Sequence, residues 1–260
     1  MLQAGPHSYA EQGKGPPLVC LHGIGGDDRG FAAQLASLSD TFRVIAWNMP
    51  GYRNSTPLPA FIFSALADAL ADFLNRLNLP RATLIGHSIG GMVAQEAALT
   101  MPDRVDRLVL IGTTPAFGGR DPSFAQSFLK ARLAPLDAGQ TMAQMAAEAA
   151  PHLTGPTASA KTRAAVAQTI ADTPETVWRD ILTCLTTFNR HDDLHRITRP
   201  CLLISGGHDA NAPAKTMARM AASLPDAQHL TIETAGHMIQ IEAPGQVNTA
   251  IRNFLTKAAP

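Results

Sequence analysis

Short runs of apolar residues recur along the chain and predict the strands of a buried sheet. The runs cover residues 18–21, 42–47, 82–85, 107–111, 201–204 and 229–232. Most of them lack the polar and apolar alternation of a half-exposed strand, which indicates burial on both faces. Because longer amphipathic stretches separate most of the runs, we predict an α/β fold with a mostly parallel, doubly wound sheet.

Three of the intervening stretches carry apolar residues at the 3.6-residue spacing of an amphipathic helix. The first covers residues 64–77, the second follows Ser88 and ends before Pro102, and the third covers residues 244–258. We expect the apolar stripes of these helices to cover the faces of the sheet.

The pattern changes between residues 115 and 199, where alanines, prolines and scattered methionines replace the apolar runs and no strand is predicted. We therefore divide the chain into a core (1–114), a helical cap (115–199) and a second part of the core (200–260). The insertion falls between two sheet strands, so we expect the cap to lie over the carboxyl ends of the strands, where open α/β sheets bind ligands. Its composition predicts a mainly apolar pocket.

The composition narrows the choice of partner and compartment. The chain has 260 residues, of which 45% are apolar, enough to form one core domain that carries an insertion. Lys plus Arg equals Asp plus Glu at 21 each, so the chain lacks the excess of basic residues that is typical of nucleic-acid binding. The balanced charge favours a neutral small-molecule substrate. The first residues show no signal-peptide pattern, and no apolar run reaches the roughly 18 residues of a membrane span. We expect a cytoplasmic monomer or homodimer that does not bind membranes.

The three cysteines, Cys20, Cys184 and Cys201, are far apart in the sequence and have no metal-ligand spacing. We expect them to be buried, small hydrophobic residues.

Gly86-His87-Ser88-Ile89-Gly90 fits the pattern G-x-S-x-G and stands between a predicted strand and a predicted helix. A serine on so sharp a turn presents its hydroxyl at the amino end of the helix, where the helix dipole favours developing negative charge. The competing interpretation is an ordinary glycine-rich turn, which the strand-turn-helix context disfavours. We predict Ser88 as a nucleophile.

A serine hydroxyl needs a histidine to take its proton and a carboxylate to orient that histidine. Asp209 and His237 follow the predicted strands 201–204 and 229–232, so both lie in loops at the same edge of the sheet as Ser88. The chain order Ser, Asp, His is that of hydrolases whose nucleophilic serine lies on a sharp turn between a strand and a helix. We therefore predict Asp209 and His237 as the other two catalytic residues.

Other histidines fit the base role less well. His22 and His87 adjoin glycine turns, which indicates a structural role, and His208 is the immediate neighbour of the predicted carboxylate. His191 and His195 have the i, i+4 spacing of metal ligands, but no third ligand is nearby, so we predict no metal site.

Amide donors for an oxyanion are expected from two turns. The segment Leu21-His22-Gly23-Ile24-Gly25-Gly26 follows a predicted strand and directs the N–H of Ile24 toward the serine, while the N–H of Ile89 follows the nucleophile directly. A phosphate-binding loop is the alternative, but G-x-x-x-x-G-K-[ST] is absent from the sequence.

The motifs LHGIGG, NMPGYRNS, GHSIGG, ISGGHDANAP and AGHMIQIEAP occur in the order and spacing of the α/β-hydrolase fold family, and the chain resembles that family over essentially its whole length. The segment FNRHDDL resembles the stretch by which many members leave the cap. The resemblance implies Ser88 as nucleophile, His237 as base, Asp209 as its orienting carboxylate, and the amides of Ile24 and Ile89 as oxyanion donors. Members commonly have Asp and Gly where this chain has Asn48 and Arg53, and the role of these two residues stays open.

The resemblance leaves several activities open. The leading hypothesis is hydrolysis of a small carboxylic ester or (enol-)lactone through an acyl-enzyme, with no cofactor, as in esterases and enol-lactonases. Alternatives are carbon–carbon bond hydrolysis of the meta-cleavage-product type, whose enzymes commonly have Trp where this chain has Met238, and a cofactor-free haloperoxidase or perhydrolase activity. A non-catalytic ligand receptor on the same scaffold is the fourth hypothesis, which the intact Ser, His and Asp set disfavours.

Overall fold

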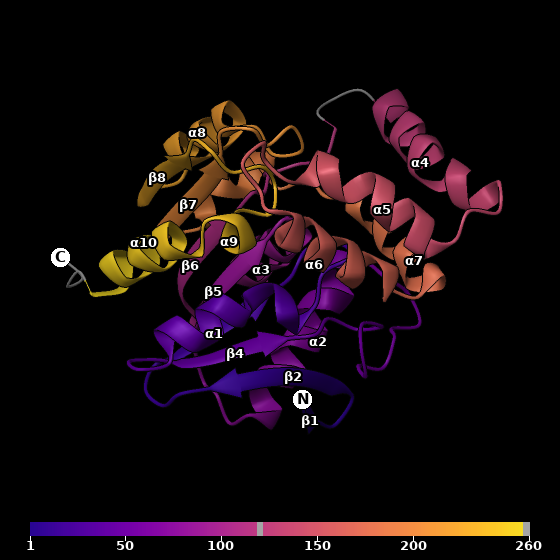
Figure 1. Ribbon diagram of the computed structural model, residues 1–260. Coiled ribbons are helices and arrows are strands. Elements are labelled where there is room, and N and C mark those ends of the chain that lie inside the picture. The colour runs from indigo at the N-terminus through magenta and orange to yellow at the C-terminus, as the bar shows by residue number, and fades with distance from the viewer. Residues whose placement is uncertain (119–121, 257–260) are drawn as a thin grey trace.

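A computed structural model describes residues 1–118 and 122–256 and contains, within those residues, one sheet of eight strands (Figure 1). Six neighbouring strands, in the order β4-β3-β5-β6-β7-β8, are parallel, while β1 and β2 form an antiparallel hairpin at the β4 edge. The strands are β1 Leu2–Ala4, β2 His7–Gln12, β3 Pro17–Leu21, β4 Arg43–Trp47, β5 Ala82–His87, β6 Val105–Ile111, β7 Cys201–Gly206 and β8 Ala227–Ile232. The predicted fold class is confirmed, and the six predicted runs form β3 to β8.

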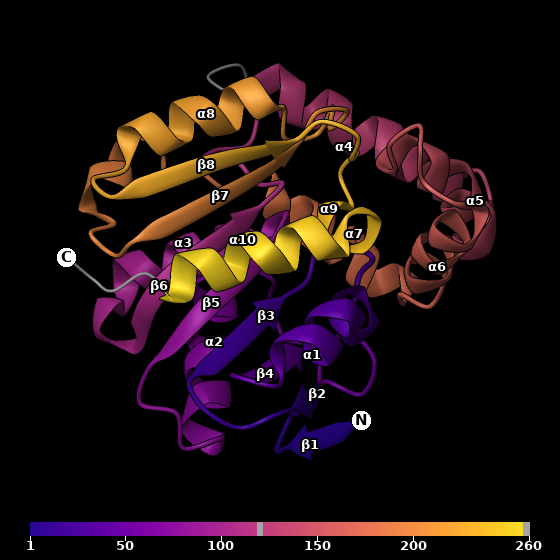
Figure 2. The same cartoon turned by 60° about the vertical axis from the view of Figure 1, so that its left-hand side comes forward.

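Helices cover both faces of the sheet (Figure 2). One face packs against α2 Phe63–Arg76, α3 Ile89–Thr100 and α8 Ala214–Ser223, and the other against α1 Ala32–Leu38, α9 Ile239–Glu242 and α10 Pro244–Thr256. Along β3, Val19 and Leu21 join the first core while Leu18 and Cys20 join the second, as alternating side chains of a strand must. The three predicted helices are α2, α3 and α10. Residues 257 and 258 of the last prediction lie outside the described part of the chain.

The described residues between β6 and β7 contain four α-helices and a 3-10 helix: α4 Pro122–Asp137, α5 Met142–Leu153, α6 Ala160–Ala171, α7 Glu175–Leu185 and the 3-10 helix His191–Arg196. Thr141 and Ser159 cap the second and third of them with their hydroxyl groups. The helices share a small core of their own, which also takes in Met238 from the loop after β8. Among the described residues, an isolated β-bridge joins Ala116, at the start of this cap, to Asn189, shortly after its last α-helix.

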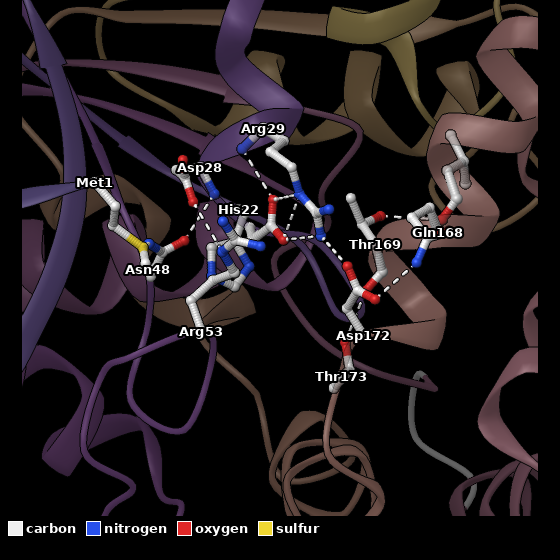
Figure 3. A network of polar contacts seen from close by, with 12 residues as sticks. Met1, His22, Asp28, Arg29, Asn48, Arg53, Gln168, Thr169, Asp172 and Thr173 are labelled. Atoms are coloured by element: carbon white, nitrogen blue, oxygen red, sulfur yellow. Dashed lines mark hydrogen bonds and ion pairs between the residues drawn. The ribbon is translucent and has the colours of Figure 1, made fainter.

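Three ion pairs between described residues join the cap to the core, and the longest is that of Arg199 with Asp103 at 3.6 Å. Arg29, in the 3-10 helix Asp28–Phe31, bonds Asp27 and reaches Asp172 at the end of α6, 2.7 Å away (Figure 3). On the opposite side, Arg190 forms a bidentate pair with the buried carboxylate of Glu96 on α3, at 2.7 and 2.9 Å. Side chains far apart in the sequence thereby fix the cap against the sheet.

The described helices include none that is both long and apolar enough to cross a bilayer. The three cysteines are buried and free, as expected. Among the described residues no group of three His, Cys, Asp or Glu side chains is arranged to hold a metal ion.

Candidate active site

Ser88 occupies the single residue between β5 and α3, with φ of 53° and ψ of −123°. This strained conformation costs about 1–3 kcal/mol and persists only where the surroundings enforce it. Gly86 and Gly90 make the turn possible, because a Cβ atom at Gly90 would lie 2.2 Å from the carbonyl oxygen of Leu21, and one at Gly86 would lie 2.5 Å from that of Gly90. The Ser88 backbone is also held by a hydrogen bond from its N–H to the Ile111 carbonyl, 2.9 Å.

Asp209 and His237 come together from the loops that follow β7 and β8. The Nδ1 atom of His237 lies 2.8 Å from Oδ2 of Asp209, whose side chain is fully buried. The other carboxylate oxygen accepts the N–H groups of Asn211 and Ala212, at 2.8 and 3.0 Å. An ionised carboxylate only accepts, so Nδ1 of His237 is the donor and Nε2 is left free to accept a proton.

The pKa of Asp209 lies below its ordinary value. Burial alone would raise this pKa, but the charge and hydrogen bond of His237, with the amides of Ala212 and Asn211, together outweigh burial. Asp209 is therefore a carboxylate at neutral pH, and it holds the His237 ring in one orientation.

The loop that carries His237 is tied to the cap through its backbone. The N–H of His237 donates to the Leu153 carbonyl at the end of α5, 2.9 Å. Glu242 accepts the N–H groups of both residues that flank His237, Gly236 at 3.0 Å and Met238 at 3.1 Å, and also that of Gly155 in the cap at 2.6 Å. Glu242 is not among the residues that the sequence predicted. Its only signal was its place in the AGHMIQIEAP motif.

The two predicted oxyanion donors lie in turns at the carboxyl ends of neighbouring strands, Ile24 after β3 and Ile89 after β5. In the described part of the chain, neither amide N–H has a hydrogen-bond partner. His22 fixes the first turn, because its Nδ1 donates to the Gly23 carbonyl at 2.8 Å while its Nε2 accepts the Met49 N–H at 3.0 Å. Both amides are therefore free to bind an oxygen of a ligand.

The five histidines that the sequence analysis compared with His237 do not compete with it in the structure. Burial and the neighbouring charge of His237 lower the pKa of His87 to about 3, and its Nε2 donates to the His237 carbonyl at 2.9 Å. Burial also lowers the pKa of His22, so both rings are neutral and structural. His191, His195 and His208 are exposed to solvent.

Ser88 and His237 line one cavity of about 520 Å³ between the sheet and the cap. Its walls are mostly apolar, as the composition predicted, and include Phe117, Phe128 and Trp178. Asp209 does not line the cavity, so its charge is shielded from a ligand behind the histidine ring.

Asn48 and Arg53 do not line this cavity; both lie in the polar network around Asp28 and His22 (Figure 3). Asn48 is fully buried, accepts the Asp28 N–H at 2.8 Å and donates to Ser8 Oγ at 3.1 Å, a pair of roles that an aspartate cannot fill. Arg53 is exposed, has a φ of 54° and lies 3.6 Å from Asp28. Glycine, which the family resemblance implies at this position, matches this backbone conformation, whereas arginine adopts it with strain.

A sequence profile described as alpha/beta hydrolase fold matches residues 16–244 of the chain. The chain belongs to the α/β-hydrolase family. A solved structure of a thermophilic esterase from Thermogutta terrifontis, with malate bound, superposes on this hydrolase with a TM-score of 0.89 and 28% identity, covering 96% of this chain and 93% of that one.

Two curated relatives extend the comparison. An (E)-2-((N-methylformamido)methylene)succinate hydrolase from Acinetobacter baylyi is 26% identical to this hydrolase over 95% of this chain and 93% of its own length. A dihydrolipoyllysine-residue acetyltransferase component of an acetoin cleaving system from Pseudomonas putida is 30% identical over 94% of this chain, which spans 64% of that protein's length.

Proposed function

We propose that this α/β hydrolase is a serine hydrolase that cleaves a small carboxylic ester or (enol-)lactone through Ser88, His237 and Asp209. The observation that carries the proposal is the strained Ser88 turn in the same cavity as His237, whose Nδ1 is held 2.8 Å from the Asp209 carboxylate. The likeness to an esterase of known structure supports an ester or lactone as the bond that is cleaved.

In the proposed mechanism Ser88 Oγ attacks the substrate carbonyl while Nε2 of His237 takes the hydroxyl proton. The resulting oxyanion accepts the N–H groups of Ile24 and Ile89, and removal of such a donor typically costs about 2.7–4 kcal/mol of transition-state stabilisation. The proton then passes from His237 to the leaving alkoxide or enolate, and the C–O bond breaks to give an acyl-enzyme.

Water completes the cycle. His237 takes a proton from the water, whose oxygen attacks the acyl carbon, and the acid product leaves as the proton returns to Ser88. Asp209 stays ionised throughout and stabilises the imidazolium that forms in each half-reaction. The mechanism requires neither metal nor organic cofactor.

Turnover of p-nitrophenyl acetate tests this proposal. We expect the wild-type protein to release nitrophenol, and Ser88→Ala to reduce the rate by about 10⁴-fold or more, because removal of a triad member leaves only the contributions of binding and the oxyanion donors. Equal rates for the two proteins would contradict Ser88 as the nucleophile.

A further inference from the structure

One charged side chain stands in the wall of the cavity that holds Ser88 and His237. Apart from histidines, Arg132 of α4 is the sole ionisable residue among the described residues that line it, and no Asp or Glu does so. The free backbone N–H groups of Ile24 and Ile89 and the amino end of α3 add partial positive charge at the floor of the cavity. A cationic ligand is therefore disfavoured, and an anionic one has a counter-charge.

Arg132 has no hydrogen-bond or ion-pair partner in the described part of the protein, although it is only partly exposed. The other arginines described in the cap all have partners. They are Arg163 with Thr154, Arg179 with Asp137 and Glu175, Arg190 with Glu96, Arg196 with Asp193, and Arg199 with Asp103. The guanidinium of Arg132 is thus available to a ligand, unlike those that fix the cap.

The position of Arg132 is set by aromatic packing. Its guanidinium lies over the Phe128 ring, 5.3 Å from the centroid, and Phe128 packs edge-on against Phe117 at 4.8 Å. Phe124, Phe128 and Arg132 are four residues apart on α4, so they share the face of the helix that lines the cavity. Stacking on an aromatic ring leaves the edge of the guanidinium free to donate to a carboxylate.

A second donor in the same wall also lacks a partner. The indole N–H of Trp178 on α7 is buried, and the described residues offer it no acceptor. Buried donors are normally paired, so an unpaired one beside a ligand cavity indicates an acceptor on the ligand. Together, Trp178 and Arg132 favour a ligand with oxygen atoms on its cap side.

We propose that the substrate carries a carboxylate that Arg132 binds, so that the hydrolase acts on half-esters or lactones of dicarboxylic acids with an apolar linker. This inference rests on the proposed function, because it places the scissile carbonyl at Ser88. A single guanidinium matches the charge and planar geometry of one carboxylate. The balanced net charge of the chain predicted a neutral substrate, but the local charge of the cavity favours an anionic one.

Two esters with the same six-carbon acyl chain test the inference by turnover. The chain ends in a carboxylate in mono-4-nitrophenyl adipate and in a methyl group in 4-nitrophenyl hexanoate. We expect Arg132→Met to lower the ratio of kcat/KM for the charged over the neutral ester by about tenfold to a hundredfold, because a hydrogen-bonded charge pair is lost. Arg219→Met is the matched control, since Arg219 is exposed on α8, its guanidinium has no hydrogen-bond or ion-pair partner among the described residues, and it does not line the cavity. A ratio that Arg132→Met leaves unchanged overturns the inference.

Binding to Ser88→Ala separates this inference from the catalytic proposal. Calorimetric titration with adipate and hexanoate needs no turnover, and we expect adipate to lose affinity by the same factor when Arg132→Met is added. If wild-type protein hydrolyses neither ester but this loss is seen, the carboxylate site stands and the proposed function fails. If the hexanoate ester is hydrolysed but adipate binds equally well with and without Arg132, the proposed function stands and the carboxylate site is overturned.

Discussion

Mutation of Glu242 tests most directly how the loop that carries His237 is held in place. Its carboxylate accepts the N–H groups of Gly155, Gly236 and Met238, at 2.6, 3.0 and 3.1 Å. Each hydrogen bond to a charged group contributes about 1.5–3 kcal/mol, but Glu242 is partly exposed and water replaces some of this. We expect Glu242→Ala to lower the free energy of unfolding by about 2–4 kcal/mol, and Glu242→Gln by about 1–2 kcal/mol, because the amide turns an N–H group toward a backbone donor.

The kinetic effect follows from the same contacts. The N–H groups of Gly236 and Met238, the residues on either side of His237, lose an acceptor. A displacement of about 1 Å of a catalytic group can reduce the rate about a hundredfold. For Glu242→Gln we expect kcat to fall about tenfold or more with a smaller change in KM, since the cavity wall is not altered.

Urea denaturation and steady-state ester hydrolysis measure the two effects. Glu233→Gln is the control, because Glu233 lies exposed in the same loop, and such surface changes stay within about 0.5 kcal/mol. A Glu242→Gln protein with the wild-type urea midpoint and kcat would refute the proposed anchoring role.

Three further results are expected elsewhere in the molecule. Arg53→Gly should raise the free energy of unfolding in urea by about 0.5–1 kcal/mol, because relief of a positive φ outweighs the loss of a long, 3.6 Å ion pair with the largely buried Asp28; a lower stability would mean that this ion pair outweighs the strain. The pKa of His87 falls from 6.5 to about 3 on folding, so the unfolded chain binds the extra proton, and stability present above pH 6.5 is lost as the pH falls toward 3. His87→Gln should therefore flatten the slope of unfolding free energy against pH by about 1.4 kcal/mol per unit between about pH 4 and 6, and an unchanged slope would exclude His87 as the titrating group. Arg190→Met should destabilise the protein by about 2–3 kcal/mol in thermal or urea unfolding, because it leaves the buried Glu96 carboxylate unpaired, whereas a change near zero would mean that water reaches this carboxylate.

The sheet core was predictable because strands buried on both faces must be apolar throughout. The hairpin β1–β2 was not, since β2 buries polar residues whose partners come from distant parts of the chain. His7 lies 3.0 Å from Asp72, and the N–H of Ser8 donates to Ser55 Oγ at 2.9 Å. No local sequence pattern indicates such distant partners, so the polar segment that forms β2 is expected to be a loop from its sequence alone.

The candidate site also contains residues that the sequence predicted and residues that it did not. Ser88 is marked by its own turn, and Asp209 and His237 are marked by their place after strands, because parallel strands bring their carboxyl ends to one edge. No local sequence motif indicates a role for Glu242 or Arg132. Their roles depend on where the cap lies and on which face of α4 turns to the cavity, and both follow from tertiary contacts.

A serine-directed sulfonyl fluoride tests the central claim, that Ser88 is a nucleophile activated by His237, most directly. Intact mass and peptide mapping after treatment should show one adduct on Ser88 in the wild-type protein. Ser88→Ala should gain none, and His237→Ala should be labelled much more slowly because the serine loses its base. An adduct on another residue, or equal labelling of the wild-type and His237→Ala proteins, would contradict this account.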